Sequence, residues 1–575
     1  MHLTQALATT CLYYLADYPT ADKYLKIAQQ IQRSIGTPTS YMELAIASLL
    51  SHGMRGNIQA AINEMDMLYH HANYSGANPL SKFFMQIIQA NYLEMQGLED
   101  NYRESKAHLQ AQFSNELEQS HLGPFLHVWD MDMLMAQGRY AGALNLAERV
   151  LGNPAYADNS HLVSQFLHYQ ALALAYLGRE DEVLPVVRKS LRVRANAGGR
   201  YFVTLNHAML GGALSLGKHT QTAERILTRV IRESHAIGEH YAGATALAYR
   251  AALRLRLGQG AEAKADTQAM FDTMRIYGNR HFFGWTPHLM KSVLGFASAQ
   301  GIHPGTARML AQKRLGTCIL PDCQCIPVLR VSTFFGTELI LDGKEEVLLP
   351  QDFTPLQAKT LGLLAMAPSY SRSLEQIQQE LWPSQSEESC RSKLDTMLSR
   401  LRKVLSDTFG PEFTKMYLVV RAGTVSLHHC SSDVADAMNE AQEGLRLSAL
   451  SRHFQAHCAF VRMSVVLGAT PGGGLCRPGL VLPTHLMPTI MEAAVQWVKI
   501  LKIGARFQDA LVVAQHALSL DPINDRLQRM RYNLLTILKR PAEAGAALRD
   551  YRRCLTEEGF SESEIEEIVD VLLTE

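Results

Sequence analysis

The sequence lacks the long apolar runs that mark membrane proteins. None of its segments reaches about 18 consecutive uncharged apolar residues, the length that a membrane-spanning helix needs. The start, MHLTQALATTCLYYLADYPT, has no basic stretch and reaches an acid at Asp17, so it is not typical of a secretory signal. Cysteine is also scarce, because nine residues spread unevenly over 575 do not predict a disulfide framework. These absences favour a cytoplasmic protein without membrane contacts.

Motifs of catalysis are absent as well. The chain contains no G-x-x-x-x-G-K-[ST] loop, no H-E-x-x-H, no G-x-S-x-G and no C-x-x-C pair. The glycine-rich stretch 469–479 has no lysine that could reach a phosphate, and we interpret it as a loop. The pairs His70-His71 and His428-His429 are isolated, and we interpret them as ordinary side chains. We therefore expect no enzyme, no catalytic residue, no cofactor and no metal ion.

Three cysteines, Cys318, Cys323 and Cys325, lie within eight residues of one another. A soft-metal site needs further ligands at suitable spacing, and none is evident nearby. We interpret them as ordinary reduced thiols, with metal binding or redox sensing as the open alternative.

The composition is that of a globular protein with several domains. Hydrophobic residues make up 47% and charged residues 19%, and the length corresponds to three to five domains of ordinary size. The 55 basic and 55 acidic residues cancel. A neutral total neither favours nor excludes nucleic acid, because a local basic patch is what binds it.

A repeat of about 40 residues fills the first half of the chain. Fragments such as NYLEMQGLED and ALAYLGREDEV share an apolar helix end, a turn glycine and a new amphipathic run. The turn glycines are Gly56, Gly97, Gly138, Gly178, Gly217 and Gly258, with Gly301 extending the series. Two helices cannot bury their apolar faces alone, but stacked copies can, and they form a superhelix. The repeats resemble the lengthened tetratricopeptide (TPR) type of bacterial maltose-regulon activators, which implies that residues 1–314 receive a protein or a small-molecule inducer.

The pattern changes after this half. We expect a linker at 315–326 and short strands near 327–333, 336–341 and 346–349, with a hairpin turn at Asp342-Gly343. Three helices follow, and the sequence marks where each begins. Thr354-Pro355-Leu356-Gln357 is a capping box, Ser373-Leu374-Glu375-Gln376 starts the second helix, and the third helix runs from about Glu387 to Leu405.

The third helix is amphipathic in an unusual way. On a helical wheel, the apolar residues from Cys390 to Leu405 form one stripe. Small polar residues line the centre of the opposite face, and cations flank it. Small groups can approach base edges in a DNA major groove while long cations reach phosphates. We therefore expect Arg391, Arg400, Arg402 and Lys403 to hold phosphates and Ser392, Lys393 and Thr396 to read bases.

A hairpin with a basic tip follows this helix. MYLVVRAGTVSLHHC places two strands around Arg421-Ala422-Gly423, and Arg391 to Arg421 contains seven basic and three acidic residues. Strands, three helices and a hairpin predict a winged helix at 327–430, in which Arg421 is the wing contact to DNA. A solvated charged face is the simpler alternative for the helix alone.

These motifs resemble the winged helix of response regulators of the OmpR/PhoB type and, more closely, that of the SARP (antibiotic-regulatory-protein) family of bacterial activators. The third helix matches the SARP pattern at Arg391, Leu394, Leu398, Ser399, Arg400, Leu401 and Arg402. It departs at Ser392, where Asn is usual, and at Asp395, where Arg is common. The change at Asp395 replaces a cation by an anion and implies a different target sequence.

The last segment, 431–575, is predicted to be helical again. Gly504, Ala510, Ala517 and Pro522 stand at tetratricopeptide spacing. This segment resembles the bacterial transcriptional activator domain that follows the winged helix in the SARP family. The resemblance implies contact with RNA polymerase and DNA binding as a homodimer or in tandem.

The sequence therefore predicts a mostly α protein with a central α+β winged-helix domain between two TPR-like helical domains. We interpret it as a transcriptional regulator, an activator by its resemblance, that binds double-stranded DNA. The alternative is an interaction scaffold whose winged helix docks protein rather than DNA, which the neutral charge and Asp395 favour.

Overall fold

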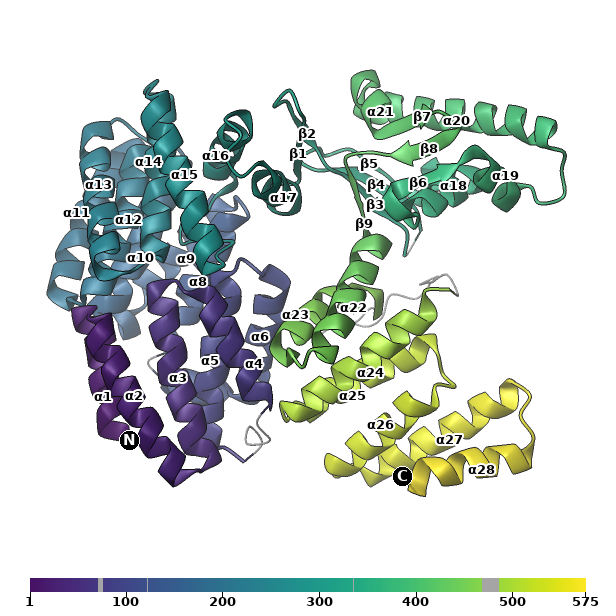
Figure 1. Ribbon diagram of the computed structural model, residues 1–575, viewed down its shortest axis with the longest axis horizontal. Helices are drawn as coiled ribbons and strands as arrows, with labels where there is room; N and C mark the ends of the chain where they lie inside the picture. Colours follow the sequence, from purple (N-terminus) through teal and green to yellow (C-terminus); the bar gives the residue numbers. More distant parts are fainter. Residues whose placement is uncertain (71–75, 121, 335, 468–484, 575) are drawn as a thin grey trace. The chain divides into compact units, whose positions relative to one another are not determined.

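The computed structural model describes residues 1–575 except 71–75, 121, 335, 468–484 and 575 (Figure 1). Its contacts divide the chain into two compact units, Met1–Leu315 with Pro321–Cys323, and Gly316–Leu320 with Gln324–Glu575. The expected loop at 469–479 and the residue His71 lie outside the described residues. Within the described part, no helix is long and apolar enough to cross a bilayer.

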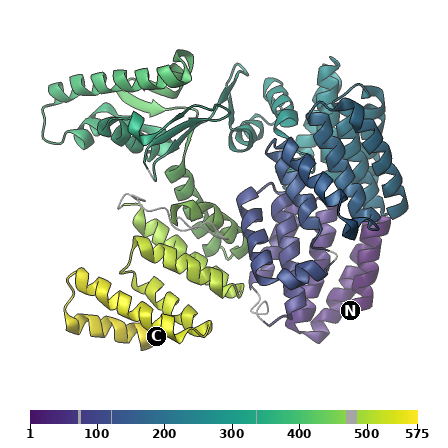
Figure 2. The same cartoon turned by 180° about the vertical axis from the view of Figure 1, so that it is seen from behind.

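Antiparallel helix pairs make up the first unit (Figure 1, Figure 2). Its helices are α1 (His2–Thr10), α2 (Tyr18–Ile35), α3 (Pro38–Arg55), α4 (Ile58–His70), α5 (Pro79–Met95), α6 (Glu99–Gln112), α7 (Ser114–Gln119), α8 (Phe125–Ala136), α9 (Tyr140–Leu151), α10 (Ser160–Tyr176), α11 (Glu180–Ala197), α12 (Arg200–Ser215), α13 (Thr220–Ile237), α14 (Tyr241–Arg256), α15 (Gly260–Tyr277), α16 (Pro287–Ala299) and α17 (Pro304–Leu315). From α3 onward, each repeat glycine lies between the two helices of one pair, so the predicted TPR-like architecture is confirmed.

The repeat glycines end helices in the left-handed conformation. Gly56, Gly97, Gly138, Gly178 and Gly258 have φ values between 63° and 75°, which residues with a Cβ rarely adopt. Gly217 is the exception, since its φ is not in this region; a Cβ there would meet the Glu180 carboxylate at 2.5 Å. Backbone conformation therefore requires glycine at five of the six turns.

Segments distant in sequence close the first unit on itself. The Tyr241 hydroxyl donates to the Met95 carbonyl at 2.8 Å, and the His240 amide donates to the Arg55 carbonyl at 2.9 Å. A Cβ on Gly56 would meet the Tyr241 amide nitrogen at 2.9 Å. The turns of the early repeats therefore serve as packing surfaces for α14 and its neighbours.

Two small sheets and four helices form the winged helix in the second unit. One sheet has the order β5 (Val347–Leu348), β4 (Glu338–Leu341), β3 (Leu329–Ser332) and β9 (Cys430–Ser432), and β9 runs parallel to β3. The other has the order β6 (Ser371–Ser373), β8 (Thr424–Leu427) and β7 (Leu418–Arg421). The helices are α18 (Pro355–Ala365), α19 (Leu374–Leu381), α20 (Glu387–Phe409) and α21 (Pro411–Tyr417). The predicted capping box at Thr354 is present, and the predicted helix start at Ser373 also forms a capping box.

A further hairpin lies just before these strands. β1 (Thr317–Ile319) pairs with β2 (Cys325–Pro327) in the stretch that the sequence analysis assigned to a linker. Cys318 lies opposite Ile326, and Cys325 lies opposite Ile319, so the two cysteines project to opposite faces of the hairpin. Burial raises the pKa of the Cys318 thiol to about 11, which disfavours the thiolate that a metal or an oxidant needs.

Helices complete the second unit. They are α22 (Asp433–Ala449), α23 (His453–Met463), α24 (Met487–Ile503), α25 (Phe507–Leu520), α26 (Asp525–Ile537), α27 (Pro541–Glu557) and α28 (Glu562–Thr574). Ala510 and Ala517 are fully buried, as the tetratricopeptide spacing predicted. At the expected Gly504 turn, Ala505 takes the positive φ instead.

Replacing Gly56 by alanine should destabilise the protein more than replacing Gly178. Both have φ near 70°, so either change costs about 1–2 kcal/mol of backbone strain. At Gly178 the new Cβ meets nothing within 4 Å, whereas at Gly56 it meets backbone at 2.9 Å and costs about 1–3 kcal/mol more. Urea unfolding of the full-length chain, followed by circular dichroism, measures both losses. Equal losses would show that Tyr241 does not pack on this turn.

Candidate nucleic-acid interface

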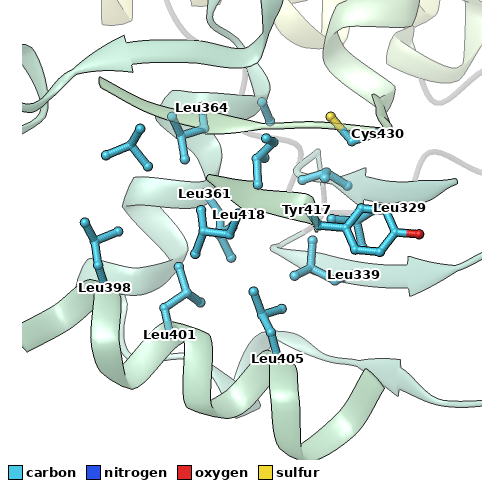
Figure 3. Close-up of a cluster of buried hydrophobic side chains, with 14 of the residues drawn as sticks. Leu329, Leu339, Leu361, Leu364, Leu398, Leu401, Leu405, Tyr417, Leu418 and Cys430 are labelled. Carbon is cyan, nitrogen blue, oxygen red and sulfur yellow. The ribbon is translucent and has the colours of Figure 1, made fainter. Parts of the chain in front are cut away.

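Burial of one side of α20 decides which residues face outward. Leu394, Leu398, Leu401 and Leu405 of this helix are at most 3% exposed, and they pack into the core of the winged helix against α18 and strands of both sheets (Figure 3). Cys390 and Met397 complete the stripe. The predicted apolar side of the helix is therefore the buried side.

The opposite side of α20 carries the residues that were predicted to contact DNA. Arg391, Ser392, Lys393, Thr396, Arg400 and Lys403 are all exposed. The Thr396 hydroxyl donates to the Ser392 carbonyl at 2.9 Å, so its proton is used inside the helix and only its lone pairs and methyl group face outward. The Lys393 ammonium donates to the Gln385 side chain just before the helix.

Three cations of this face, unlike Lys393, have no partner in the described part of the chain. Arg391, Arg400 and Lys403 form no ion pair or side-chain hydrogen bond there. Arginines on other helix faces do pair: Arg179 binds Glu182 at 2.6 Å and Arg446 binds Glu443 at 2.7 Å, each three residues away. Arg391, Arg400 and Lys403 therefore remain available to an external anion.

Arg402 differs from the other cations. Its side chain is half-buried, and one guanidinium nitrogen lies 3.5 Å from the carbonyl oxygen of Leu418 in β7. This places the guanidinium beside the first strand of the wing. The helical wheel put Arg402 on the same flank as Arg391 but could not show this contact, because β7 follows sixteen residues later.

Asp395 is exposed on the same face. It lies one helical turn from Arg391 at the i, i+4 spacing that permits an ion pair, yet these two side chains do not pair in the structure. Between Arg391 and Lys403, the outward side of α20 is thus a row of small polar groups flanked by cations, with Asp395 among them.

The wing is a three-stranded sheet with a basic tip. Ala422 and Gly423 both have positive φ, as a two-residue hairpin of type I′ requires. Arg421 stands opposite Thr424 at the end of the hairpin, and both are exposed. By strand alternation, Ser426 lies on the same face as these two residues, and Val425 faces the core.

Sequence reasoning missed this polar face of the wing. Besides Arg421 it carries Thr424 and Ser426 from β8, and Ser371 and Ser373 from β6. The alternation T-V-S-L in β8 was a signal for Thr424 and Ser426. The contribution of Ser371 and Ser373 could not be predicted from the sequence, because the pairing of β6 with β8 joins residues more than fifty positions apart.

Comparison with known proteins gives no family for the chain. No family model and no curated protein matches it. Among solved structures, EmbR of Mycobacterium tuberculosis in complex with a low-affinity phosphopeptide is 16% identical with a TM-score of 0.31. That match covers 43% of this chain and 65% of EmbR, so the chain spans just under two thirds of the EmbR structure.

Two further solved structures are similar to parts of this chain. A Rap protein complexed with competence and sporulation factor is 10% identical with a TM-score of 0.39, over 54% of this chain and 87% of that one. The P58(IPK) TPR domain is 11% identical with a TM-score of 0.17, over 78% and 97%.

Replacing Leu401 by alanine should destabilise the protein much more than replacing Arg400, because the two residues lie on opposite sides of α20. Leu401 is fully buried, so its truncation should cost about 2–5 kcal/mol. Arg400 touches no described partner, so its truncation should stay within about 0.5 kcal/mol of wild type. Thermal unfolding followed by circular dichroism provides the comparison. A large loss for Arg400→Ala would mean that its side chain supports the fold rather than facing a partner.

Proposed function

We propose that this chain is a sequence-specific DNA-binding transcriptional regulator, and that its second unit inserts α20 into the major groove. The observation that carries the proposal is the outward face of α20, where Arg391, Arg400 and Lys403 have no partner among the described residues. Small polar side chains lie between these cations, so the helix can approach base edges without a steric barrier.

The phosphate backbone is the natural partner of such a face. Cations on both flanks of a groove-bound helix meet the two phosphate chains, while residues along its centre meet base edges. We assign Arg391, Arg400 and Lys403 to phosphates, and Arg402 to phosphate contact at the junction of helix and wing. Ser392, Lys393 and Thr396 are the base-reading residues in this proposal.

The wing supplies a second contact. Arg421 lies at the tip of the β7–β8 hairpin, and the hydroxyls of Thr424 and Ser426 share its face. A hairpin of this kind meets the DNA backbone or the adjacent minor groove beside the helix. Arg421 is therefore the wing cation of the proposal.

The helical domains take the remaining roles of the proposal. The repeats of the first unit receive the signal, a protein or a small molecule, and helices α22–α28 support pairing of two copies and contact with RNA polymerase. The repeat architecture supports the first role, because stacked helix pairs present extended binding surfaces. The resemblance of the last segment to transcriptional activator domains motivates the second. Activation is the direction that the same resemblance implies.

Fluorescence anisotropy of the full-length chain with duplex DNA tests the proposal. DNA from upstream of the chain's own gene and a scrambled duplex are titrated at several salt concentrations. Tighter binding to the natural duplex, weakening steeply as salt rises, is expected because each neutralised phosphate releases counterions. Absence of binding to any duplex at about 50 mM salt, where phosphate contacts are barely screened, would favour a protein-docking scaffold instead.

Arg400→Ala and Lys403→Ala should weaken binding to every duplex alike. Each removes one phosphate contact, so the slope of log affinity against log salt should fall by about one in magnitude for each variant. The matched control is Arg446→Ala, which removes an exposed cation of α22 that is already paired with Glu443. An unchanged affinity and salt slope for Arg400→Ala would show that this residue does not contact phosphate.

Thr396→Ala should change sequence preference rather than salt dependence. A base-edge contact discriminates between bases by about 1–3 kcal/mol, whereas a phosphate contact does not discriminate. Selection from a randomised duplex library, for wild type and variant, measures the effect. If both proteins select the same sites with the same preference, Thr396 does not read a base.

A further inference from the structure

A cluster of ionisable side chains lies in the interior of the first unit, far from the candidate interface in sequence. Glu94 of α5, Asp132 of α8 and His281 between α15 and α16 are all fully buried. One ligand-type atom from each lies within 4.8 Å of the others. The three residues come from segments that are distant in the chain, so their approach is a product of the fold.

Asp132 is fully engaged by donors. Its carboxylate accepts hydrogen bonds from the Tyr169 hydroxyl at 2.8 Å, the Gly284 amide at 2.9 Å and His281 Nε2 at 2.7 Å. Glu94 has the opposite environment, because neither of its carboxyl oxygens receives a hydrogen bond within the described residues. An ionised carboxylate in that position would be a buried, unpaired charge, which costs several kcal/mol. The cluster therefore requires one more positive charge beside Glu94.

That charge could belong to a metal ion or to a proton, and Arg314 decides between them. Its guanidinium lies 3.0 Å from His281 Nδ1 and can only donate, so Nδ1 must accept. The proton of neutral His281 is then on Nε2, where it is donated to Asp132. A metal ion would need the Nε2 lone pair, which this tautomer does not offer.

The charge balance leads to the same answer. Arg314 and Asp132 contribute one positive and one negative charge, and a neutral His281 adds none. A divalent ion would leave a net positive charge in the presence of both carboxylates, whereas one proton on Glu94 gives a neutral cluster. Arg314 is also fixed in place, since it donates to the Arg280 carbonyl at 3.0 Å and lies 4.2 Å from the centre of the Trp285 ring.

We propose that Glu94 and Asp132 form a buried site for a single proton, which Glu94 carries and donates to Asp132 at neutral pH. This hydrogen bond joins α5 to α8. Asp132 also accepts hydrogen bonds from His281 and Gly284, in the segment between α15 and α16. Burial, the Asp132 charge and the hydrogen bond to Asp132 all raise the pKa of Glu94 well above its ordinary value. Burial alone would raise the pKa of Asp132, but its hydrogen bonds from His281, Gly284 and Tyr169 outweigh burial and lower it.

Burial lowers the pKa of the Arg314 guanidinium to about 10, so Arg314 stays charged at neutral pH. Burial and the nearby carboxylates raise the pKa values of Tyr102, Tyr169 and Tyr241, so these tyrosines stay neutral. Asp130, the other carboxylate near Glu94, is paired with the Lys106 ammonium at 2.6 Å.

The neighbouring histidines are neutral as well. Burial lowers the pKa of His281 to about 4 and that of His168 to about 3. Glu94 is therefore the group of this cluster that gains or loses a proton as pH rises from neutral.

The consequence is a pH-sensitive fold. The pKa of Glu94 is raised in the folded state, so between its unfolded value near 4.3 and its folded value the native protein holds the extra proton. Folding is favoured below this window and loses up to about tenfold in its equilibrium constant for each pH unit within it. Ionisation of Glu94 would set two adjacent negative charges against each other and loosen the contacts among α5, α8 and the segment 279–286.

Infrared spectroscopy of the wild-type protein tests the site without relying on a variant. At pH 7 we expect a carbonyl band of a protonated carboxyl group that shifts when glutamate is labelled with ¹³C. Glu94→Gln keeps a donor toward Asp132 and should weaken the band by the share of one carboxyl group, whereas Glu118→Gln, an exposed control, should leave it unchanged. Burial also raises the pKa of Glu239 to about 7, so its carboxyl group contributes to the same band and remains in both variants. The pH dependence of urea unfolding should be shallower for Glu94→Gln than for wild type.

Two results would overturn the proposal. One is the absence of a labelled protonated-carboxyl band in folded wild-type protein at pH 7. The other is one equivalent of a divalent metal in protein purified without chelator, measured by elemental analysis and lost in Glu94→Gln. These outcomes are independent of DNA binding, because none of the measurements involves DNA.

Discussion

The packing of α20 on the core of the winged helix is the contact on which the function of the second unit depends. Leucines spaced three and four apart fix the rotation of the helix about its axis, because all of them must reach the core at once. Once that rotation is fixed, Ser392 and Thr396 must face outward. A shift of one residue would turn the cations toward the core, where unpaired charges cost several kcal/mol.

Some arginines are paired with acids of neighbouring helices, whereas the exposed cations of α20 form no ion pair among the described residues. In the first unit, Arg250 and Arg254 share Asp266, and Arg254 also binds Glu224, so cations of neighbouring helices are neutralised internally. On α20, Arg391, Arg400 and Lys403 form no ion pair among the described residues, although Asp395 and Asp407 lie on the same helix. From Arg391 to Arg421 the chain has seven basic and three acidic residues, so a neutral chain can still present a local excess of positive charge.

Local features of the fold were predictable from sequence, and the reason is that short-range chemistry determines them. Thr354 with Gln357 and Ser373 with Gln376 form capping boxes, each of which lies within four consecutive residues. The repeat period located the turn glycines for the same reason, since each turn needs a residue that tolerates positive φ. The two-residue wing turn at Ala422-Gly423 was likewise legible from its immediate neighbours.

Features that depend on distant partners were not predictable. The parallel pairing of β9 with β3 joins residues about a hundred positions apart, and no local pattern signals it. A helical wheel could not predict the contact of Arg402 with β7, because a wheel gives the direction of a side chain but not its tertiary neighbours. The cluster of Glu94, Asp132 and His281 is the extreme case. Each residue alone looks like an ordinary polar side chain, and only the closure of the superhelix brings them together.

The closure and the polar cluster support each other. Gly97, one of the repeat glycines, leaves room at the end of α5 for the Arg314 guanidinium, which a Cβ there would meet at 2.7 Å. Arg314 in turn fixes the tautomer of His281 and thereby the proton that Asp132 accepts. A glycine that the repeat requires for its backbone thus also admits the arginine that sets the protonation of the interior. Gly97 therefore serves both the turn of its repeat and the packing of Arg314 beside the buried cluster.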